Sequence, residues 1–138
     1  MRFFILVQRN NMFSHVMLGV KDLEASKQFY DVVLNTLGIQ PGVRDGSRYF
    51  YFSPTGIFAI TTPLNGEPAT HGNGSTIGFA APSPEHAESF HAAGLIAGGV
   101  TCENPPGWRP GVTRQIYMAY LRDLDGNKLC ALHRPMKV

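Results

Sequence analysis

Two stretches of the chain share one order of hydrophobic and polar positions, 61 residues apart. Every second residue is apolar from 16 to 20 and again from 77 to 81. Such alternation predicts a strand with one buried face. Asp22 follows the first strand and Ser83 the second, and side-chain oxygens of these types cap free backbone amides at a helix start. Each stretch therefore predicts a strand that leads directly into a helix.

The two predicted helices differ in the strength of their apolar stripe. Residues 22–37 carry apolar side chains at a spacing of 3.6 over the whole segment. Residues 84–97 begin with Pro84, which suits the first helical turn because its missing N–H is not needed there. The weaker stripe of this second helix consists of Ala87, Phe90 and Leu95.

Further strands are predicted after each helix. In the first copy they cover residues 39–44, 47–53 and 57–62, and in the second copy residues 100–102, 115–122 and 128–133. Residues 103–114 contain three prolines and two glycines, so we expect a loop there. The chain is thus predicted to be an α+β protein of two tandem βαβββ modules, related by a pseudo-twofold axis and packed into one domain.

Composition narrows the class of protein. Lys and Arg number 12, Asp and Glu number 10, and the net charge of +2 is not gathered in a basic run, so a nucleic-acid partner is not expected. No apolar stretch approaches the roughly 20 residues of a membrane span. The two cysteines form no CxxC pair, and the apolar run of residues 3–7 is too short for an export signal. We therefore expect a cytoplasmic protein that does not interact with membranes.

Three segments carry a family likeness: residues 15–30, Leu37-Gly38 and residues 123–129. With them, the chain resembles the vicinal oxygen chelate superfamily, which includes glyoxalase I, extradiol dioxygenases and the fosfomycin- and bleomycin-resistance proteins. The resemblance implies sheets curled around a small-molecule cavity, helices outside, and a homodimer. The internal repeat divides the chain into an N-terminal extension (1–12) and a single domain (13–138), with module one at 13–63, a linker at 63–74 and module two at 75–134.

The resemblance also implies positions for a divalent metal (Zn, Ni, Fe or Mn). These positions fall on His15, on Thr76, on Cys130 and near Ala59 or Thr61. Only His15 is of the usual ligand type, and Cys130 is a substitute, so we expect weak or absent metal binding. The alternatives are that His15 lines the cavity as a hydrogen-bonding group and that Cys130 is a small buried residue.

Other residues are candidates for contact with a ligand. Trp108 and Arg109 lie in the predicted loop, which is a lid over the cavity, a dimer contact, or a segment whose Trp covers the edge of the core. Tyr117 lies on a strand near Cys130, and His71 lies in the linker, from which it can turn toward a metal or toward solvent. The substrate-binding set is His15, Thr76, Trp108, Arg109, Tyr117 and Cys130.

Three hypotheses about function follow. The first is a glyoxalase-like enzyme, of lyase, isomerase or dioxygenase type, that acts on a small metabolite with vicinal oxygens and is assisted by a metal. The second is a metal-free protein that binds or sequesters a small molecule, as bleomycin-resistance proteins do. The third is a dimeric interaction module, which leaves the polar residues of the pocket face unexplained.

Overall fold

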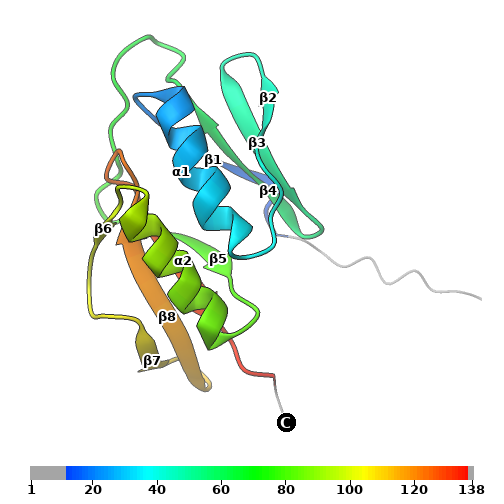
Figure 1. Ribbon diagram of the computed structural model, residues 1–138, viewed down its shortest axis with the longest axis vertical. Helices are drawn as coiled ribbons and strands as arrows, with labels where there is room; N and C mark the ends of the chain where they lie inside the picture. The colour runs from blue at the N-terminus through cyan, green and yellow to red at the C-terminus, as the bar shows by residue number, and fades with distance from the viewer. Residues whose placement is uncertain (1–11, 137–138) are drawn as a thin grey trace, which may run out of the picture.

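The computed structural model describes residues 12–136 (Figure 1). The predicted extension therefore lies, except for Met12, outside the described residues. Module one forms a four-stranded sheet in the order β1-β4-β3-β2, with β1 and β4 parallel and the other pairs antiparallel. Its elements are β1 (His15–Gly19), α1 (Leu23–Asn35), β2 (Val43–Asp45), β3 (Arg48–Ser53) and β4 (Gly56–Thr61).

Module two repeats this arrangement in a second sheet of order β5-β9-β8-β6. Again the opening strand pairs in parallel with the last strand of its module, and the other neighbours are antiparallel. The elements are β5 (Ile77–Ala80), α2 (Pro84–Ile96), β6 (Val100–Thr101), β7 (Gly107–Pro110), β8 (Gln115–Arg122) and β9 (Lys128–His133). The prediction of an α+β fold with two tandem βαβββ modules is confirmed.

The predicted loop at 103–114 is wrong in one respect, because it contains the strand β7. This strand pairs with the first half of β8, while β6 pairs with its second half. Together β6 and β7 take the place that β2 has in module one. Pro110 is tolerated because β7 is an edge strand, and the missing N–H of a proline can face solvent there. In module one the predicted strand 39–44 is in fact shorter and starts later, at Val43.

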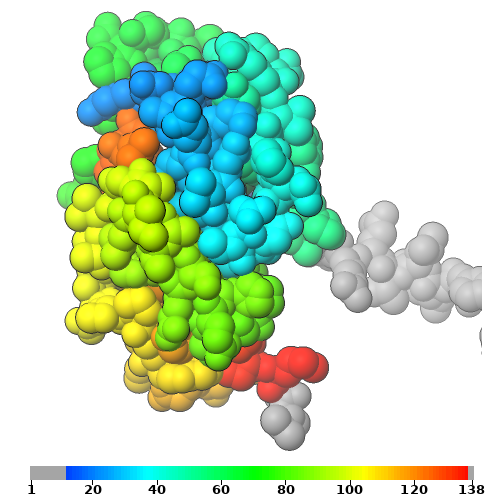
Figure 2. Space-filling model, in the orientation of Figure 1, coloured from blue at the N-terminus to red at the C-terminus, as the bar shows by residue number. Residues whose placement is uncertain are grey.

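Both helices lie side by side and cover one side of the two sheets (Figures 1 and 2). Their starts are capped as predicted: Asp22 Oδ1 accepts from the Ala25 amide at 3.0 Å, and Ser83 Oγ accepts from the His86 amide at 3.2 Å. Aromatic rings join the modules beneath the helices, with Phe79 5.2 Å from Phe58 between ring centroids.

One residue of the predicted α2 stripe is misplaced. Ala87 and Phe90 are fully buried, but Leu95 is 41% exposed. Gly94 faces the sheet in its place, and a Cβ there would lie 2.3 Å from Leu121 Cδ1. The absence of a side chain at Gly94 allows α2 to approach β8 closely, which apolar periodicity alone does not reveal.

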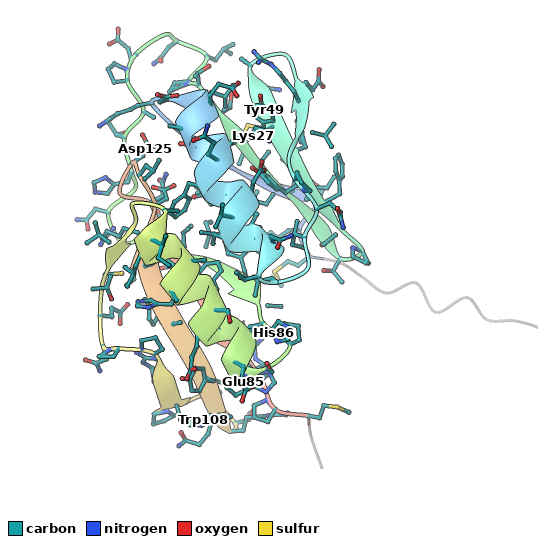
Figure 3. The ribbon with its side chains drawn as sticks, viewed as in Figure 1. Lys27, Tyr49, Glu85, His86, Trp108 and Asp125 are labelled. Carbon is teal, nitrogen blue, oxygen red and sulfur yellow. The ribbon has the colours of Figure 1, made fainter. Side chains whose placement is uncertain are left out.

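The turn between β8 and β9 fastens module two to the start of α1. Asp125 Oδ1 accepts from the Lys21 amide at 2.8 Å, and Asn127 Nδ2 donates to the Gly19 carbonyl at 3.3 Å. Figure 3 shows Asp125 on this turn, beside the start of α1. The two modules are thus joined by polar contacts as well as by the aromatic core. Within residues 12–136 no helix has the length and apolar character needed to cross a bilayer.

Candidate functional site

A cavity of about 480 Å³ opens where the two modules meet. Its walls are the start of β1, the end of α1 with the residues that follow it, the turn between β3 and β4, and all of β5. Small-molecule sites in proteins typically measure about 300–1,000 Å³ and are mainly apolar with a few polar groups. The cavity has this character, because Leu34, Leu37, Ile39 and Phe79 contribute apolar walls.

His15 supplies an imidazole to the cavity rim. It lies at the start of β1 and lines the cavity together with its neighbour Val16. The side chain is exposed, and Ser14 Oγ lies 2.8 Å from His15 Nδ1. This contact engages Nδ1 and leaves Nε2 without a hydrogen-bond partner among the described residues. If the Ser14 hydroxyl donates to Nδ1, Nε2 carries the proton and is a donor.

Tyr51 lines the cavity, and its hydroxyl already forms hydrogen bonds within the protein. The hydroxyl donates to Asp31 Oδ1 at 2.8 Å and lies 3.3 Å from the Lys27 carbonyl. Burial, together with the hydrogen bond to Asp31, raises the pKa of Tyr51 far above its usual range. The phenol is therefore neutral at physiological pH.

The four positions implied for a metal do not supply a metal site within one chain. Across residues 12–136 no three His, Cys, Asp or Glu side chains come together as a metal site requires. Thr76 is exposed, and Ala59 is fully buried in β4. Cys130 is buried, and its burial raises the pKa of the thiol to about 11. These donors do not fit the usual requirement of three protein ligands.

Arg109 binds the backbone of its own segment. Its guanidinium donates to the carbonyls of Met118 at 2.7 Å and Asn104 at 2.8 Å, and it lies 5.4 Å from the ring centroid of Tyr120. Further contacts reach the carbonyls of Pro105 and Gly107. Most of its donors are therefore occupied, and the residue fixes the segment between β6 and β7 on the sheet face away from α2.

Trp108 and Tyr117 lie on the other face of the same sheet, beside the start of α2. Their rings meet edge to face with centroids 5.3 Å apart, and the Tyr117 hydroxyl donates to Glu88 at 2.5 Å. That hydrogen bond, with partial burial, raises the pKa of Tyr117 to about 12. Trp108 is half exposed at the lower end of the molecule in Figure 3. Neither residue lines the 480 Å³ cavity.

Of the six residues predicted to bind a substrate, the cavity wall contains His15 alone. The residues that the sequence did not single out are Ser53 and Thr55, whose turn between β3 and β4 forms part of the wall. Their pattern is typical of an ordinary tight turn, and Ser53 Oγ indeed accepts from the amides of Thr55 and Gly56. No local feature of the sequence could show that this turn borders a cavity.

Comparison with known proteins assigns the fold to a family. The profile described as "Glyoxalase/Bleomycin resistance protein/Dioxygenase superfamily" matches residues 12–131. A glyoxalase/bleomycin resistance protein from Albidiferax ferrireducens T118 has a crystal structure with 69% sequence identity and a TM-score of 0.87, covering 89% of this chain and 99% of that one.

More distant solved structures share the fold. A glyoxalase-related enzyme from Fulvimarina pelagi is 19% identical with a TM-score of 0.68, over 94% of each chain. A glyoxalase/bleomycin resistance protein/dioxygenase family enzyme from Burkholderia phytofirmans PsJN is 18% identical with a TM-score of 0.66, over 87% of this chain and 96% of that one. No curated protein matches the sequence.

Proposed function

The chain belongs to the glyoxalase/bleomycin resistance protein/dioxygenase superfamily, and from this premise we propose that it binds a small, largely apolar molecule with one oxygen-bearing group directed at His15. The observation that carries the proposal is the cavity itself. Its size suits a small molecule, its walls are mainly apolar, and one imidazole stands at its rim. Members of this superfamily bind small molecules, which agrees with this use of the cavity.

Binding without a metal is favoured over metal-assisted chemistry by the donor set. Of the positions implied for a metal, His15 alone carries a ligand of the usual type, and residues 12–136 bring no three ligand side chains together. The apolar walls supply affinity through the burial of ligand surface, at about 25 cal/mol for each Å². The hydrogen bond to His15 then selects for a polar group at one end of the ligand.

Two matched probes separate these contributions. Naphthalene and 1-naphthol differ by one hydroxyl, and both are smaller than the cavity. We expect His15→Ala to weaken 1-naphthol binding by roughly threefold to tenfold, the usual effect of one hydrogen bond, and to leave naphthalene binding unchanged. Ala80→Phe, which fills the cavity from β5, should weaken both, as measured by calorimetry.

The control is His86→Ala, an exposed histidine at the start of α2 that does not line the cavity. Figure 3 shows His86 near the first turn of that helix. This variant should bind both probes like the unaltered protein. If Ala80→Phe binds each probe as tightly as the unaltered protein does, the ligand site lies outside this cavity.

A second candidate is catalysis on a small metabolite with vicinal oxygens, of lyase, isomerase or dioxygenase type. The contact between Ser14 and His15 favours it, because a ring held at Nδ1 presents Nε2 in a defined direction for proton transfer. Proton exchange with the substrate would then be the role of His15. Turnover of a bound metabolite that is lost in His15→Ala, with binding retained, would distinguish this candidate from simple sequestration.

We also infer that the chain forms a homodimer through the face of the module-one sheet that the helices leave open. Val43 pairs with Phe50 on that face, and Phe50 stacks on Phe52 with ring centroids 6.4 Å apart. Val43 is 55% and Phe52 54% exposed. A contiguous exposed apolar surface of this kind is typical of a protein contact.

A further inference from the structure

A second hollow, polar and separate from the cavity, lies beside the segment that leads into β5. It measures about 200 Å³ and is lined by residues 71–75 of the linker together with Arg122 and Lys128. Arg122 ends β8, Lys128 begins β9, and the two residues are direct partners in the antiparallel register. Their side chains therefore lie on the same face of the sheet. Both cationic residues line the hollow together with the linker.

Residues 72–75 of the linker form a tight turn whose backbone borders the hollow. Ser75 donates its amide to the Gly72 carbonyl at 3.3 Å, and Gly74 has a φ of 94°. The φ of Gly74 favours glycine there, and a Cβ at Gly72 would lie 2.3 Å from Ser75 Oγ, so the Ser75 side chain would have to turn away. In the described part of the chain the amides of Asn73 and Gly74 donate no hydrogen bond. Free amides in such a turn are typical partners of an anion.

The cations retain donors for a ligand. Arg122 donates one N–H to the Gly126 carbonyl at 2.8 Å, which leaves the rest of its guanidinium free to bind. Lys128 forms an ion pair with Glu103, and its ammonium lies 4.9 Å from the ring centroid of Tyr120. Glu103 is thus the carboxylate that competes for Lys128.

The backbone around Glu103 is constrained, and this constraint holds its carboxylate near Lys128. Its φ of 58° is the single positive value outside glycine in residues 12–136. The next two carbonyls, of Asn104 and Pro105, are held by Arg109. Strained residues of this kind persist where the surrounding structure constrains them, and they cluster at ligand sites.

We propose that the hollow binds the phosphate group of a small ligand through Arg122, Lys128 and the linker amides, and that Glu103 competes with this phosphate for Lys128. A phosphate is favoured over a carboxylate because displacement of Glu103 leaves two cationic side chains, which match a doubly charged group. The volume exceeds that of a free phosphate ion, so a phosphate ester also fits. The proposal does not depend on what the larger cavity binds.

The test is a titration of the ¹⁵N-labelled full chain, at constant ionic strength and pH 7.5, with inorganic phosphate, methyl phosphate or acetate. We expect saturable shifts of the Asn73 and Gly74 amide signals with both phosphates, and binding of acetate weaker by about tenfold or more. Tighter binding of methyl phosphate would assign the site to an organic phosphate, and equal binding would assign it to the free ion.

Three variants test the assignment of residues. Arg122→Gln and, independently, Lys128→Gln should each raise the Kd for methyl phosphate by about tenfold. Glu103→Gln should lower that Kd severalfold, because the internal competitor is removed. Arg48→Gln removes an exposed arginine of β3 that does not line the hollow, and it should leave the Kd unchanged.

Shifts that rise linearly without saturation, or that acetate reproduces at equal concentration, would overturn the phosphate site. A Kd unaltered in both Arg122→Gln and Lys128→Gln, with spectra that show a folded chain, would overturn it as well. An unaltered or raised Kd in Glu103→Gln would refute the competition. If Arg122→Gln or Lys128→Gln does not fold, the Kd of the other variant tests the proposal.

Discussion

The hydroxyl of Tyr30 in α1 donates a hydrogen bond to Asp123 Oδ2 at 2.5 Å, across the boundary between the two modules. Tyr30 is fully buried and Asp123 is 4% exposed. Asp123 Oδ1 accepts from the amides of Asp125 and Asn127, each at 2.9 Å, and Oδ2 accepts a further bond from Asn127 Nδ2. Burial and the neighbouring Asp123 raise the pKa of Tyr30, so the phenol remains a donor.

Tyr30→Phe should therefore destabilise the protein by about 2 kcal/mol, since it removes a donor from a buried carboxylate. Urea unfolding followed by circular dichroism measures the change. The matched control is Tyr120→Phe, whose hydroxyl forms a hydrogen bond, within residues 12–136, only with the Met118 sulfur at 3.5 Å. This change should alter the free energy of unfolding by less than about 0.5 kcal/mol. Equal effects of the two substitutions would mean that the contact with Asp123 does not hold the modules together.

Gly126 should tolerate a side chain poorly for two separable reasons. Its φ is 88°, and a Cβ would lie 2.9 Å from His71 Nδ1. Gly38 has a similar φ of 83° with nothing within 4 Å of a Cβ. We expect Gly38→Ala to cost about 1 kcal/mol of unfolding free energy from backbone strain alone.

Gly126→Ala should cost roughly 1 kcal/mol more than Gly38→Ala, because the His71 ring must move as well. Thermal and urea unfolding of the two variants give the difference. Adding His71→Ala to Gly126→Ala should remove that excess. An excess that survives in the double variant would show that the ring is not the obstacle.

The two cysteines should differ sharply in reactivity. Cys102 is half-buried, whereas Cys130 is 4% exposed and its burial raises the pKa of its thiol to about 11. At pH 8 roughly one Cys130 thiol in a thousand is ionised, and the thiolate is the reactive form. Ellman's reagent should therefore label about one thiol per folded chain quickly, and Cys102→Ser should abolish this fast phase.

The rate at Cys130 should rise with pH up to about 11, because the thiolate fraction grows as pH approaches the raised pKa. Denaturant should make both thiols equally reactive at pH 8. Rapid labelling of Cys130 in the folded Cys102→Ser variant at pH 7 would contradict the buried thiol and restore it as a candidate metal ligand.

Metal content discriminates between the two candidate functions. Because residues 12–136 bring no three ligand side chains together, we expect protein purified without a histidine tag to contain much less than one equivalent of zinc, nickel, iron or manganese. Elemental analysis by mass spectrometry measures this. One equivalent of any of them, lost in His15→Ala, would refute metal-free binding and support the enzyme.

Assembly can be tested at the open face of the module-one sheet. Light scattering at micromolar concentration should give about twice the chain mass of 15.1 kDa. Phe52→Arg places a charge in the exposed apolar face and should yield a monomer. Val112→Arg, at a fully exposed position in module two, is the control and should remain dimeric. A monomeric mass for the unaltered protein would contradict the homodimer.

Much of the fold was predictable because its signals are local. The alternation at 16–20 and 77–81, the capping residues Asp22 and Ser83 and the repeat offset predicted the two modules without any knowledge of distant contacts. β7 escaped prediction because its prolines and glycines are typical of a loop, and only the pairing of Trp108 with Tyr117 reveals a strand.

The composition of each site was decided by tertiary structure. Alternation tells which face of a strand a residue occupies, but not which faces of two modules meet. Packing of the modules placed His15 beside β5 to form a cavity, left Trp108, Arg109 and Tyr117 outside it, and brought His71 to Arg122 and Lys128. The engagement of Arg109 by carbonyls and the burial of Cys130 have the same origin, since both depend on contacts between segments far apart in the chain.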